Sequence, residues 1–134
     1  MNVRLLYLSG TNIEQDDARA KWQSIAQGLL RQKNIMCITP PKYRGTLSTP
    51  KLPSIEVQRD KSDIMMADAF LAKCEFPSFA TSMQIMFAWS LQKKIILVTT
   101  SLSPWLQFHA SVIFSSLDEA IDALEFPPLD SKGK

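Results

Sequence analysis

The sequence predicts an α/β fold in which helices cover both faces of a parallel sheet. Short apolar runs alternate with longer helical patterns along the 134 residues of the chain, an order typical of strand–helix–strand units. The apolar runs are continuous instead of alternating with polar residues, as expected for strands buried on both faces. The length suits one domain, which we place at residues 1–125, followed by a frayed tail over residues 126–134.

The first part of the chain predicts two strands, a helix between them and a long loop. Residues 3–8 are apolar and lead into Ser9-Gly10, and residues 35–38 form a second short apolar run. Apolar residues at helical spacing predict the first helix; they are Trp22, Ile25, Ala26, Leu29 and Leu30. The proline-rich segment from Pro40 to about Ser54 has the length of a functional lid or a disordered segment.

The middle of the chain predicts two helices around a third strand. A short helix from about Val57 to Ala67 should turn Ile64 and Met65 inward, and residues 69–72 should form the strand. The next helix begins at Pro77-Ser78 and is apolar on nearly all sides. We expect it to be buried between the sheet and a second subunit, because an all-round apolar helix needs a partner on each side.

The last part predicts two strands and a final helix. The strands are residues 95–98 and 112–114, and the segment between them, with Trp105 after Pro104, is expected to be a loop. Ser116 with Glu119 three residues later is a capping-box signature for a helix that runs through Leu124. The complete arrangement is a three-layer sandwich of the flavodoxin or Rossmann type, with strand order 2-1-3-4-5.

Composition excludes several classes of function. The net charge of +2 is small and the basic residues are scattered, which argues against a nucleic-acid polymer as partner. No apolar run reaches the roughly 18 residues of a membrane span, and the start of the chain does not have the form of a secretory signal. Cys37 and Cys74 lie in apolar runs and are interpreted as buried free thiols of a reducing compartment. We therefore expect a cytoplasmic protein without metal or cofactor.

Three stretches fall at the expected carboxyl ends of strands, where ligands of such sheets gather. They are Tyr7-Leu8-Ser9-Gly10, the segment around Asp60 and Asp68, and residues 77–84. The stretches resemble, in the same order, the nucleoside 2-deoxyribosyltransferases and the related deoxynucleoside 5'-monophosphate N-glycosidases. The resemblance spans roughly residues 3 to 98. It rests on a Tyr-x-x-Gly strand end, an aspartate eight residues before an Ala-Asp pair, and a Pro-Ser-x-Gly-Thr-x-x-Glu-like helix start.

The resemblance implies a role for each of these positions. A glutamate at the position of Gln84 would attack the anomeric carbon of the sugar and form a covalent glycosyl ester. Asp60 would help to position or protonate the substrate. Ser78, with the helix start behind it, would receive a 5'-phosphate. The other predicted ligand contacts are Tyr7, Ser9, Gly10, Ala80 and Thr81, with Trp105 as a base-capping ring at a neighbouring subunit's site.

Two departures from the family pattern bear on the reaction. Gln84 is a neutral carboxamide and a poor nucleophile, so it cannot form the ester intermediate. Ala80 adds a methyl group where the family has glycine close to the ligand. Moreover, Thr11-Asn12-Ile13 offers no arginine for a phosphate. These departures predict impaired cleavage of the N-glycosidic bond and weaken the expectation of phosphate binding.

Simpler interpretations stand beside these roles. Gln84 could be an ordinary helix residue if the alignment has slipped, and Asp60 is as much a helix-surface charge as a site residue. For Asp68 we favour a cap at the strand entry, and Tyr7 is as well explained as a core residue. Trp105 is slightly better explained by packing than by base stacking. His109 is the single histidine, and it has no Ser-His-Asp, Cys-His or metal-ligand pattern around it.

Three functional hypotheses follow. The first is a homodimeric protein that binds a nucleoside or nucleotide but is impaired in cleaving it. The second is an active deoxyribosyltransferase or N-glycosidase in which Asp60 activates water. The third is a non-catalytic interaction protein whose pocket has closed, and a structure with Phe79 and Met83 filling the pocket would favour it.

Overall fold

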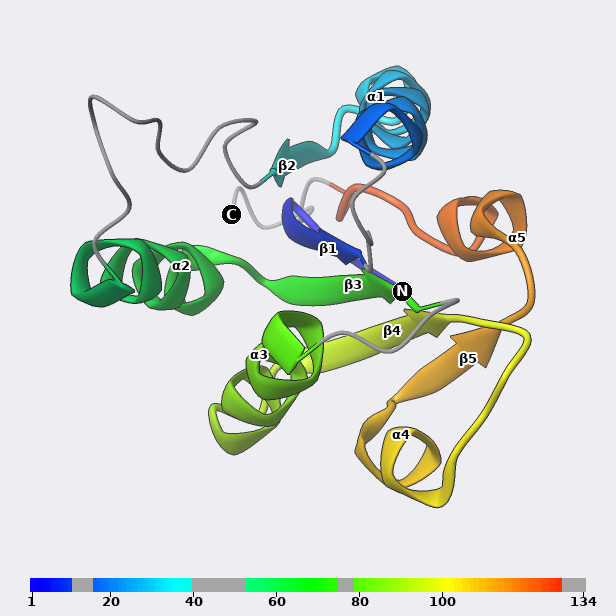
Figure 1. Cartoon of the computed structure of the whole chain (residues 1–134). Helices are drawn as coiled ribbons and strands as arrows, with labels where there is room; N and C mark the ends of the chain where they lie inside the picture. Colours follow the sequence, from blue (N-terminus) through cyan, green and yellow to red (C-terminus); the bar gives the residue numbers. More distant parts are fainter. Residues whose placement is uncertain (11–15, 40–52, 75–78, 129–134) are drawn as a thin grey trace.

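The computed structural model describes residues 1–10, 16–39, 53–74 and 79–128, and within them it has a five-stranded sheet in the order β2-β1-β3-β4-β5. All neighbouring strands are parallel. The strands are β1 (Leu5–Gly10), β2 (Met36–Ile38), β3 (Ala69–Lys73), β4 (Lys94–Val98) and β5 (Val112–Phe114). The predicted fold class and strand order are confirmed. Figure 1 shows the strands between two groups of helices.

The helices form the two outer layers of the sandwich. They are α1 (Asp16–Gln32), α2 (Pro53–Met66), α3 (Phe79–Ser90), α4 (Pro104–His109) and α5 (Leu117–Asp122). α1 and α5 lie against one face of the sheet, and α2 and α3 lie against the other, with α4 beside α3 (Figure 1). This arrangement follows from right-handed crossovers between parallel strands, which place successive helices on a face set by the strand order.

Each face of the sheet has its own apolar core, because successive side chains of a strand point to opposite sides. Leu6 and Leu8 of β1 pack under α1 and α5, while Tyr7 of the same strand packs under α2 and α3. All three side chains are fully buried. The alternation continues to the strand end, so Ser9 faces α3 and Gly10 faces α1.

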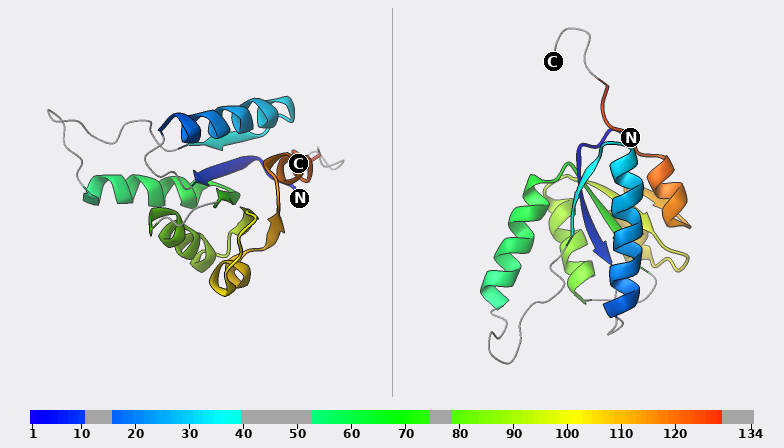
Figure 2. Two further views of the ribbon diagram at one scale, coloured as in Figure 1. Left: turned by 45° about the vertical axis from the view of Figure 1, so that its right-hand side comes forward. Right: turned by 90° about the horizontal axis from the view of Figure 1, so that it is seen from above.

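Two polar contacts fasten the edges of the sandwich. The Lys33 ammonium, just after α1, donates to the carbonyl oxygens of Ile121 at 2.8 Å and Leu124 at 2.7 Å, so it neutralises the carbonyl end of α5. Asp68 accepts from the backbone N–H of Arg4 at 2.8 Å and of Leu5 at 3.0 Å. Asp68 therefore caps a strand entry, but the strand is the neighbouring β1 and not β3, which Asp68 itself precedes. The first residues lie beside the end of α5 (Figure 2), where Val3 N–H donates to the Glu125 carbonyl.

Two details of α2 differ from the sequence prediction. The helix begins at Pro53, one turn before Val57, because a proline is tolerated in the first turn, where its missing N–H costs nothing. Ile64 is buried as predicted, but Met65 is 56% exposed. Neighbouring residues of a helix point about 100° apart, and the stripe that faces the core runs through Asp60 and Ile64, so Met65 points outward.

The segment between β4 and β5 contains a short helix, α4, where the sequence analysis expected a loop around Trp105. Ser103 caps the helix, because its side chain accepts from the N–H of Leu106, and Pro104 occupies the first turn. These are helix-start signals that the sequence contains and that the prediction passed over. The cap predicted at Ser116 is confirmed, since its hydroxyl accepts from the N–H of Glu119.

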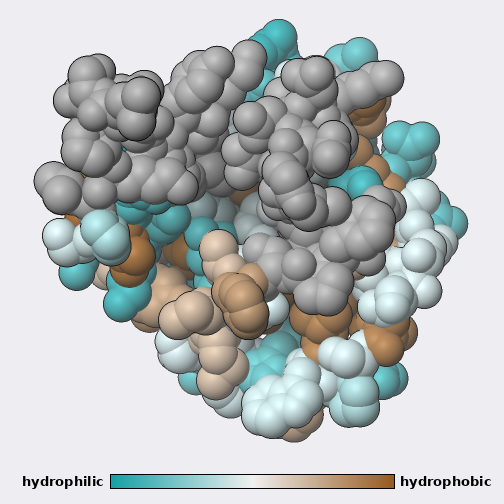
Figure 3. Space-filling view, viewed as in Figure 1, coloured by the Kyte–Doolittle hydropathy of each residue, from teal (hydrophilic) through white to brown (hydrophobic). Residues whose placement is uncertain are grey.

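One side of α3 is uncovered in the single chain. Phe79 is 93% and Met83 72% exposed in the single chain, so the sheet covers one side of the helix and leaves the other open. Figure 3 shows apolar side chains gathered over the region of α3 in the view of Figure 1. The second subunit that was expected to cover this helix stays a prediction.

The two cysteines are free thiols with different surroundings. Cys74 is buried, and burial raises its pKa to about 11. Cys37 is only partly buried, in contrast to the prediction; burial raises its pKa, and the nearby Arg31 charge offsets part of that effect. Among the described residues, no helix is both long and apolar enough to cross a bilayer.

Candidate functional site

The end of β1 brings together residues from three elements. Ser9 lies at the carboxyl end of the strand and is 2% exposed. Thr81 and Gln84 lie in the first two turns of α3, one helical turn apart, so they share a face. Asp60 comes from α2, whose contacts with α3 bring it to the same place. The edge of a parallel sheet at its carboxyl ends is where such folds bind ligands.

A chain of hydrogen bonds links these side chains. The Ser9 hydroxyl donates to the Gln84 Oε1 at 2.7 Å, and the Gln84 Nε2 donates to an Asp60 carboxylate oxygen at 3.2 Å. The hydroxyls of Ser9 and Thr81 lie 3.2 Å apart. Ser9 and Thr81 are buried, whereas Gln84 and Asp60 are partly exposed. The chain therefore begins inside the protein and ends at its surface.

The polarity of this chain is fixed by Asp60. A carboxylate only accepts hydrogen bonds, so the Gln84 amide must turn its nitrogen toward Asp60 and its oxygen toward Ser9. The reversed amide would place two acceptor oxygens against each other. Since the single Ser9 proton goes to Gln84, Thr81 is the donor in its contact with Ser9. All donors thus point toward Asp60, an arrangement in which each bond polarises the next.

Gly10 is adjacent to Ser9 but belongs to the opposite face. A β-carbon at this position would lie 2.8 Å from the Cε2 and Nε1 atoms of the Trp22 ring and closer still to Cζ2. Gly10 is therefore needed for the packing of Trp22 from α1. The ligand contact predicted for Gly10 stays a prediction. The indole N–H of Trp22 is buried and has no hydrogen-bond partner among the described residues.

Tyr7 is not at the surface of the site. Its side chain is fully buried, and its ring stacks on Phe70 of β3 at a centroid distance of 5.4 Å. A ligand contact by Tyr7 was predicted from its position near the strand end. Because the side chain has no exposed surface, the alternative interpretation as a core residue describes it better.

The remaining predicted residues lie around the site or outside the described part of the chain. Ala80 is exposed in the first turn of α3. Trp105 is 76% exposed on α4, and its ring stacks on His109 with an interplanar angle of 5°. His109 is buried, its Nδ1 lies 2.8 Å from the Trp105 carbonyl oxygen, and Trp89 meets its ring edge-on. Ser78 falls outside the described residues.

The sequence analysis missed two features of this edge. It selected Ser9, Thr81 and Gln84 separately and did not predict that they bond to one another. It also passed over Glu56, which is partly buried one turn before Asp60 on the same stripe of α2. The spacing of four between Glu56, Asp60 and the buried Ile64 was the available signal.

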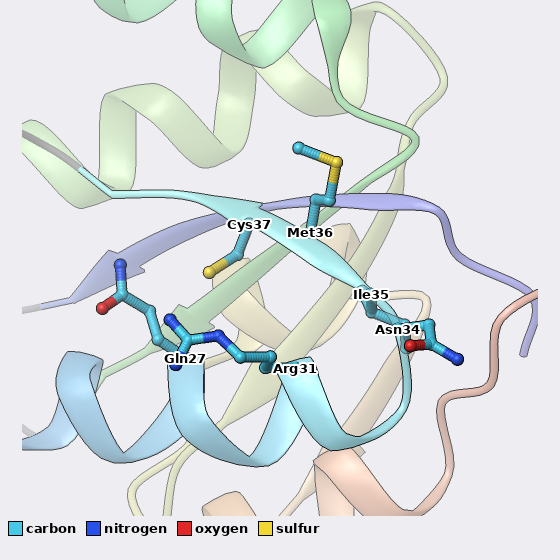
Figure 4. Close-up of a pocket in the computed structure, with 6 residues that line it drawn as sticks. All are labelled: Gln27, Arg31, Asn34, Ile35, Met36 and Cys37. Atoms are coloured by element: carbon cyan, nitrogen blue, oxygen red, sulfur yellow. The ribbon is translucent and has the colours of Figure 1, made fainter.

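A separate pocket of about 420 Å³ lies between α1 and β2. Figure 4 shows Gln27 and Arg31 of α1 with the Cys37 thiol directed toward them, while the Met36 side chain points away. Met36 and Cys37 pair with Leu5 and Leu6, near the amino end of β1. The pocket is thus distant from the Ser9 end of that strand and contains none of the predicted site residues. Within the described ranges no cluster of metal-ligating side chains is present.

Comparison with known proteins gives a structural likeness without a sequence match. No protein-family model and no curated protein matches the sequence. A 2-deoxyribosyltransferase of Bacillus psychrosaccharolyticus superposes with a TM-score of 0.73 at 14% identity, covering 93% of this chain and 99% of that one. The chain has the 2-deoxyribosyltransferase fold.

Two further structures share this fold. The 2-deoxyribosyltransferase of Leishmania mexicana has a TM-score of 0.65 at 16% identity and covers 89% of this chain and 95% of its own. The CMP N-glycosidase of Clostridium botulinum has a TM-score of 0.66 at 18% identity, with 89% and 96% covered. The 2-deoxyribosyltransferase fold therefore spans nearly the whole of each chain, so the likeness is not confined to a shared sheet.

Proposed function

We propose that this protein is a nucleoside 2-deoxyribosyltransferase-like protein that binds a nucleoside or nucleotide and is impaired in cleaving its N-glycosidic bond. The observation that carries the proposal is the bonded chain Ser9–Gln84–Asp60 at the carboxyl end of β1. An amide occupies the position that the family resemblance assigns to the nucleophilic glutamate. The fold and the resemblance of the motifs support the class of ligand.

The surroundings of Gln84 support the loss of cleavage. Gln84 donates to an acceptor on one side and accepts from a donor on the other, which an amide can do and an ionised carboxylate, being only an acceptor, cannot. A carboxylate at this position would be repelled by Asp60. The hydrogen-bonding groups around position 84 therefore suit an amide. A neutral amide neither attacks the anomeric carbon nor stabilises the positive charge that develops on the sugar.

The proposal is tested by binding and turnover together. Thermal shifts would be measured with the common nucleosides, deoxynucleosides and their 5'-monophosphates, and release of free base would be followed by chromatography. We expect stabilisation by at least one of these ligands and no base release. Base release by the wild type that is abolished in Asp60→Ala would overturn the proposal and favour the active enzyme with Asp60 as base.

A pocket filled by side chains of α3 would favour the interaction-protein hypothesis. Phe79 and Met83, the side chains expected to fill it, are 93% and 72% exposed, so neither is buried in the site. The exposed side of α3, together with Trp105 and Phe108 of α4, instead supports the proposed homodimer. Sedimentation of the wild type beside Met83→Glu tests this: we expect a dimer that the added charge separates. A wild-type monomer would contradict it. We also propose a cytoplasmic location, in keeping with two free thiols.

A further inference from the structure

We infer that the Asp60–Gln84 pair binds a hydroxyl group of the ligand and that the protein therefore prefers ribonucleosides to 2'-deoxyribonucleosides. The inference rests on the proposed function, since it takes the site to hold a nucleoside with its anomeric carbon near position 84. It deepens that function by naming the sugar.

The first step is the hydrogen-bonding capacity that the pair leaves to a ligand. A carboxamide has two N–H donors on its nitrogen, and Gln84 uses one of them for Asp60. In the described part of the chain, the other N–H has no protein partner. The Asp60 carboxylate has about four acceptor positions on its two oxygens, so it can accept from a ligand beside its protein contacts. Both side chains are partly exposed.

The second step is the chemistry that complements this surface. The pair presents a donor next to an anionic acceptor, with 3.2 Å between the Gln84 nitrogen and the Asp60 oxygen. A hydroxyl group can accept from the first and donate to the second through one oxygen atom. A phosphate would be repelled by Asp60, and an ammonium group could not accept from Gln84. A neutral hydroxyl is the group that satisfies both.

The third step is the fixed direction of the hydrogen bonds, which run from Thr81 through Ser9 and Gln84 to Asp60. Ser9, itself in contact with Thr81, holds the amide oxygen from the buried side, so Gln84 cannot turn its oxygen outward without losing the 2.7 Å bond to Ser9. The outward group is therefore always a donor. The hydroxyl nearest to an anomeric carbon held at this position is the one on C2 of the sugar, which ribose has and 2'-deoxyribose lacks. A deoxyribose would leave the second Gln84 N–H without an acceptor and would offer no proton to Asp60, and the loss of these contacts would weaken binding.

The test compares matched sugars on the wild-type protein. Affinities would be measured by calorimetry for adenosine, guanosine, cytidine and uridine, for their 2'-deoxy counterparts and for the 2'-fluoro analogue of the tightest binder. We expect the ribonucleoside to bind at least about tenfold tighter than its 2'-deoxy form, because a hydrogen bond to a charged group is worth about 1.5–3 kcal/mol and a tenfold ratio about 1.4 kcal/mol. The 2'-fluoro analogue cannot donate to Asp60 and should bind as weakly as the deoxy form.

A substitution of Gln84 tests whether this side chain distinguishes ribose from 2'-deoxyribose. Gln84→Met keeps the length of the side chain and removes its donor, so the ratio of ribo to deoxy affinity should fall to below about threefold, with the deoxy affinity retained. Gln27→Met on α1, facing the separate pocket, is the matched control and should keep the wild-type ratio. If Gln84→Met fails to fold, Asp60→Asn removes the anionic acceptor and should lower the ratio to below about threefold.

The outcomes separate the two proposals. Equal binding of ribo and deoxy forms by the wild type would overturn the preference and leave the proposed function standing. Equal weakening of both forms by Gln84→Met would overturn the role of the pair. A wild type that binds none of the nucleosides or their monophosphates would overturn both.

Discussion

Two adjacent residues at the end of β1 face different environments, although the sequence motif treats them alike. Ser9 faces α3 and enters a hydrogen-bonded chain that reaches the surface at Asp60. Gly10 faces α1, where it makes room for the ring of Trp22. Both were predicted to contact a ligand, because both belong to the Tyr-x-x-Gly strand end that carries the family resemblance. The difference shows that one strand end joins a polar hydrogen-bonded chain on one face of the sheet and an aromatic packing contact on the other.

The largest effect should come from Gly10→Ala. The new methyl group would overlap the Trp22 ring, and overpacking of this kind costs about 1–3 kcal/mol or more. Urea unfolding measures the change. A companion substitution, Trp22→Leu, should relieve much of the clash, so the two changes should be clearly non-additive. Unchanged stability in Gly10→Ala would show that the glycine is not required for packing.

The next largest effect concerns Cys74, which is buried in the apolar core on the same face of the sheet as Ser9. Burial raises the pKa of Cys74 from 9.0 to about 11. The folded state therefore keeps the thiol proton to higher pH than the unfolded state. Its contribution to stability is complete below pH 9.0, and about 2–3 kcal/mol is lost as the pH rises to about 11. Cys74→Ala should remove this part of the alkaline loss in urea unfolding. The same loss in both proteins would contradict a buried thiol.

Ser9→Ala should cost less, about 1 kcal/mol, because it removes one hydroxyl from the hydrogen-bonded chain, while the partly exposed Gln84 can still reach water. The control is Ser90→Ala at the exposed end of α3, where the hydroxyl donates only to the Phe87 carbonyl within the same helix. That control should change the free energy of unfolding by less than about 0.5 kcal/mol. Equal effects of the two substitutions would mean that the chain through Ser9 adds nothing to stability.

The smallest effect is expected from Gly28→Ala, the counterpart of the Gly10 substitution. Gly28 lies inside α1, and a β-carbon there would meet nothing within 4 Å. Alanine should stabilise the helix by about 0.5–1 kcal/mol, measured by thermal or urea unfolding. A loss of stability would contradict the open space described beside this residue. A gain in stability from Gly28→Ala and a loss from Gly10→Ala would show that packing requires a glycine at position 10 but not at position 28.

Much of the fold could be predicted from the sequence because continuous apolar runs mark buried strands. The Ser116 cap is likewise a local signal, since Glu119 follows it by three residues. The bonds of Asp68 are not local, because they reach Arg4 and Leu5 at the start of β1. The direction of a side chain near an element end did not, since it depends on tertiary packing: Met65 points outward, and Tyr7 is fully buried. The site residues were selectable one by one, but their mutual bonds depend on how α2 and α3 meet. Nothing in the local sequence around Gln84 specifies Asp60 as its partner.

The most direct test of the central claim compares base release by the wild type and by Gln84→Glu. Both would be incubated with every nucleoside or monophosphate that the wild type binds, and free base would be separated and quantified. We expect no release by the wild type and measurable release by Gln84→Glu, limited by the second carboxylate placed beside Asp60. Base release by the wild type that Asp60→Ala abolishes would contradict the account, because the protein would then cleave its ligand without the glutamate.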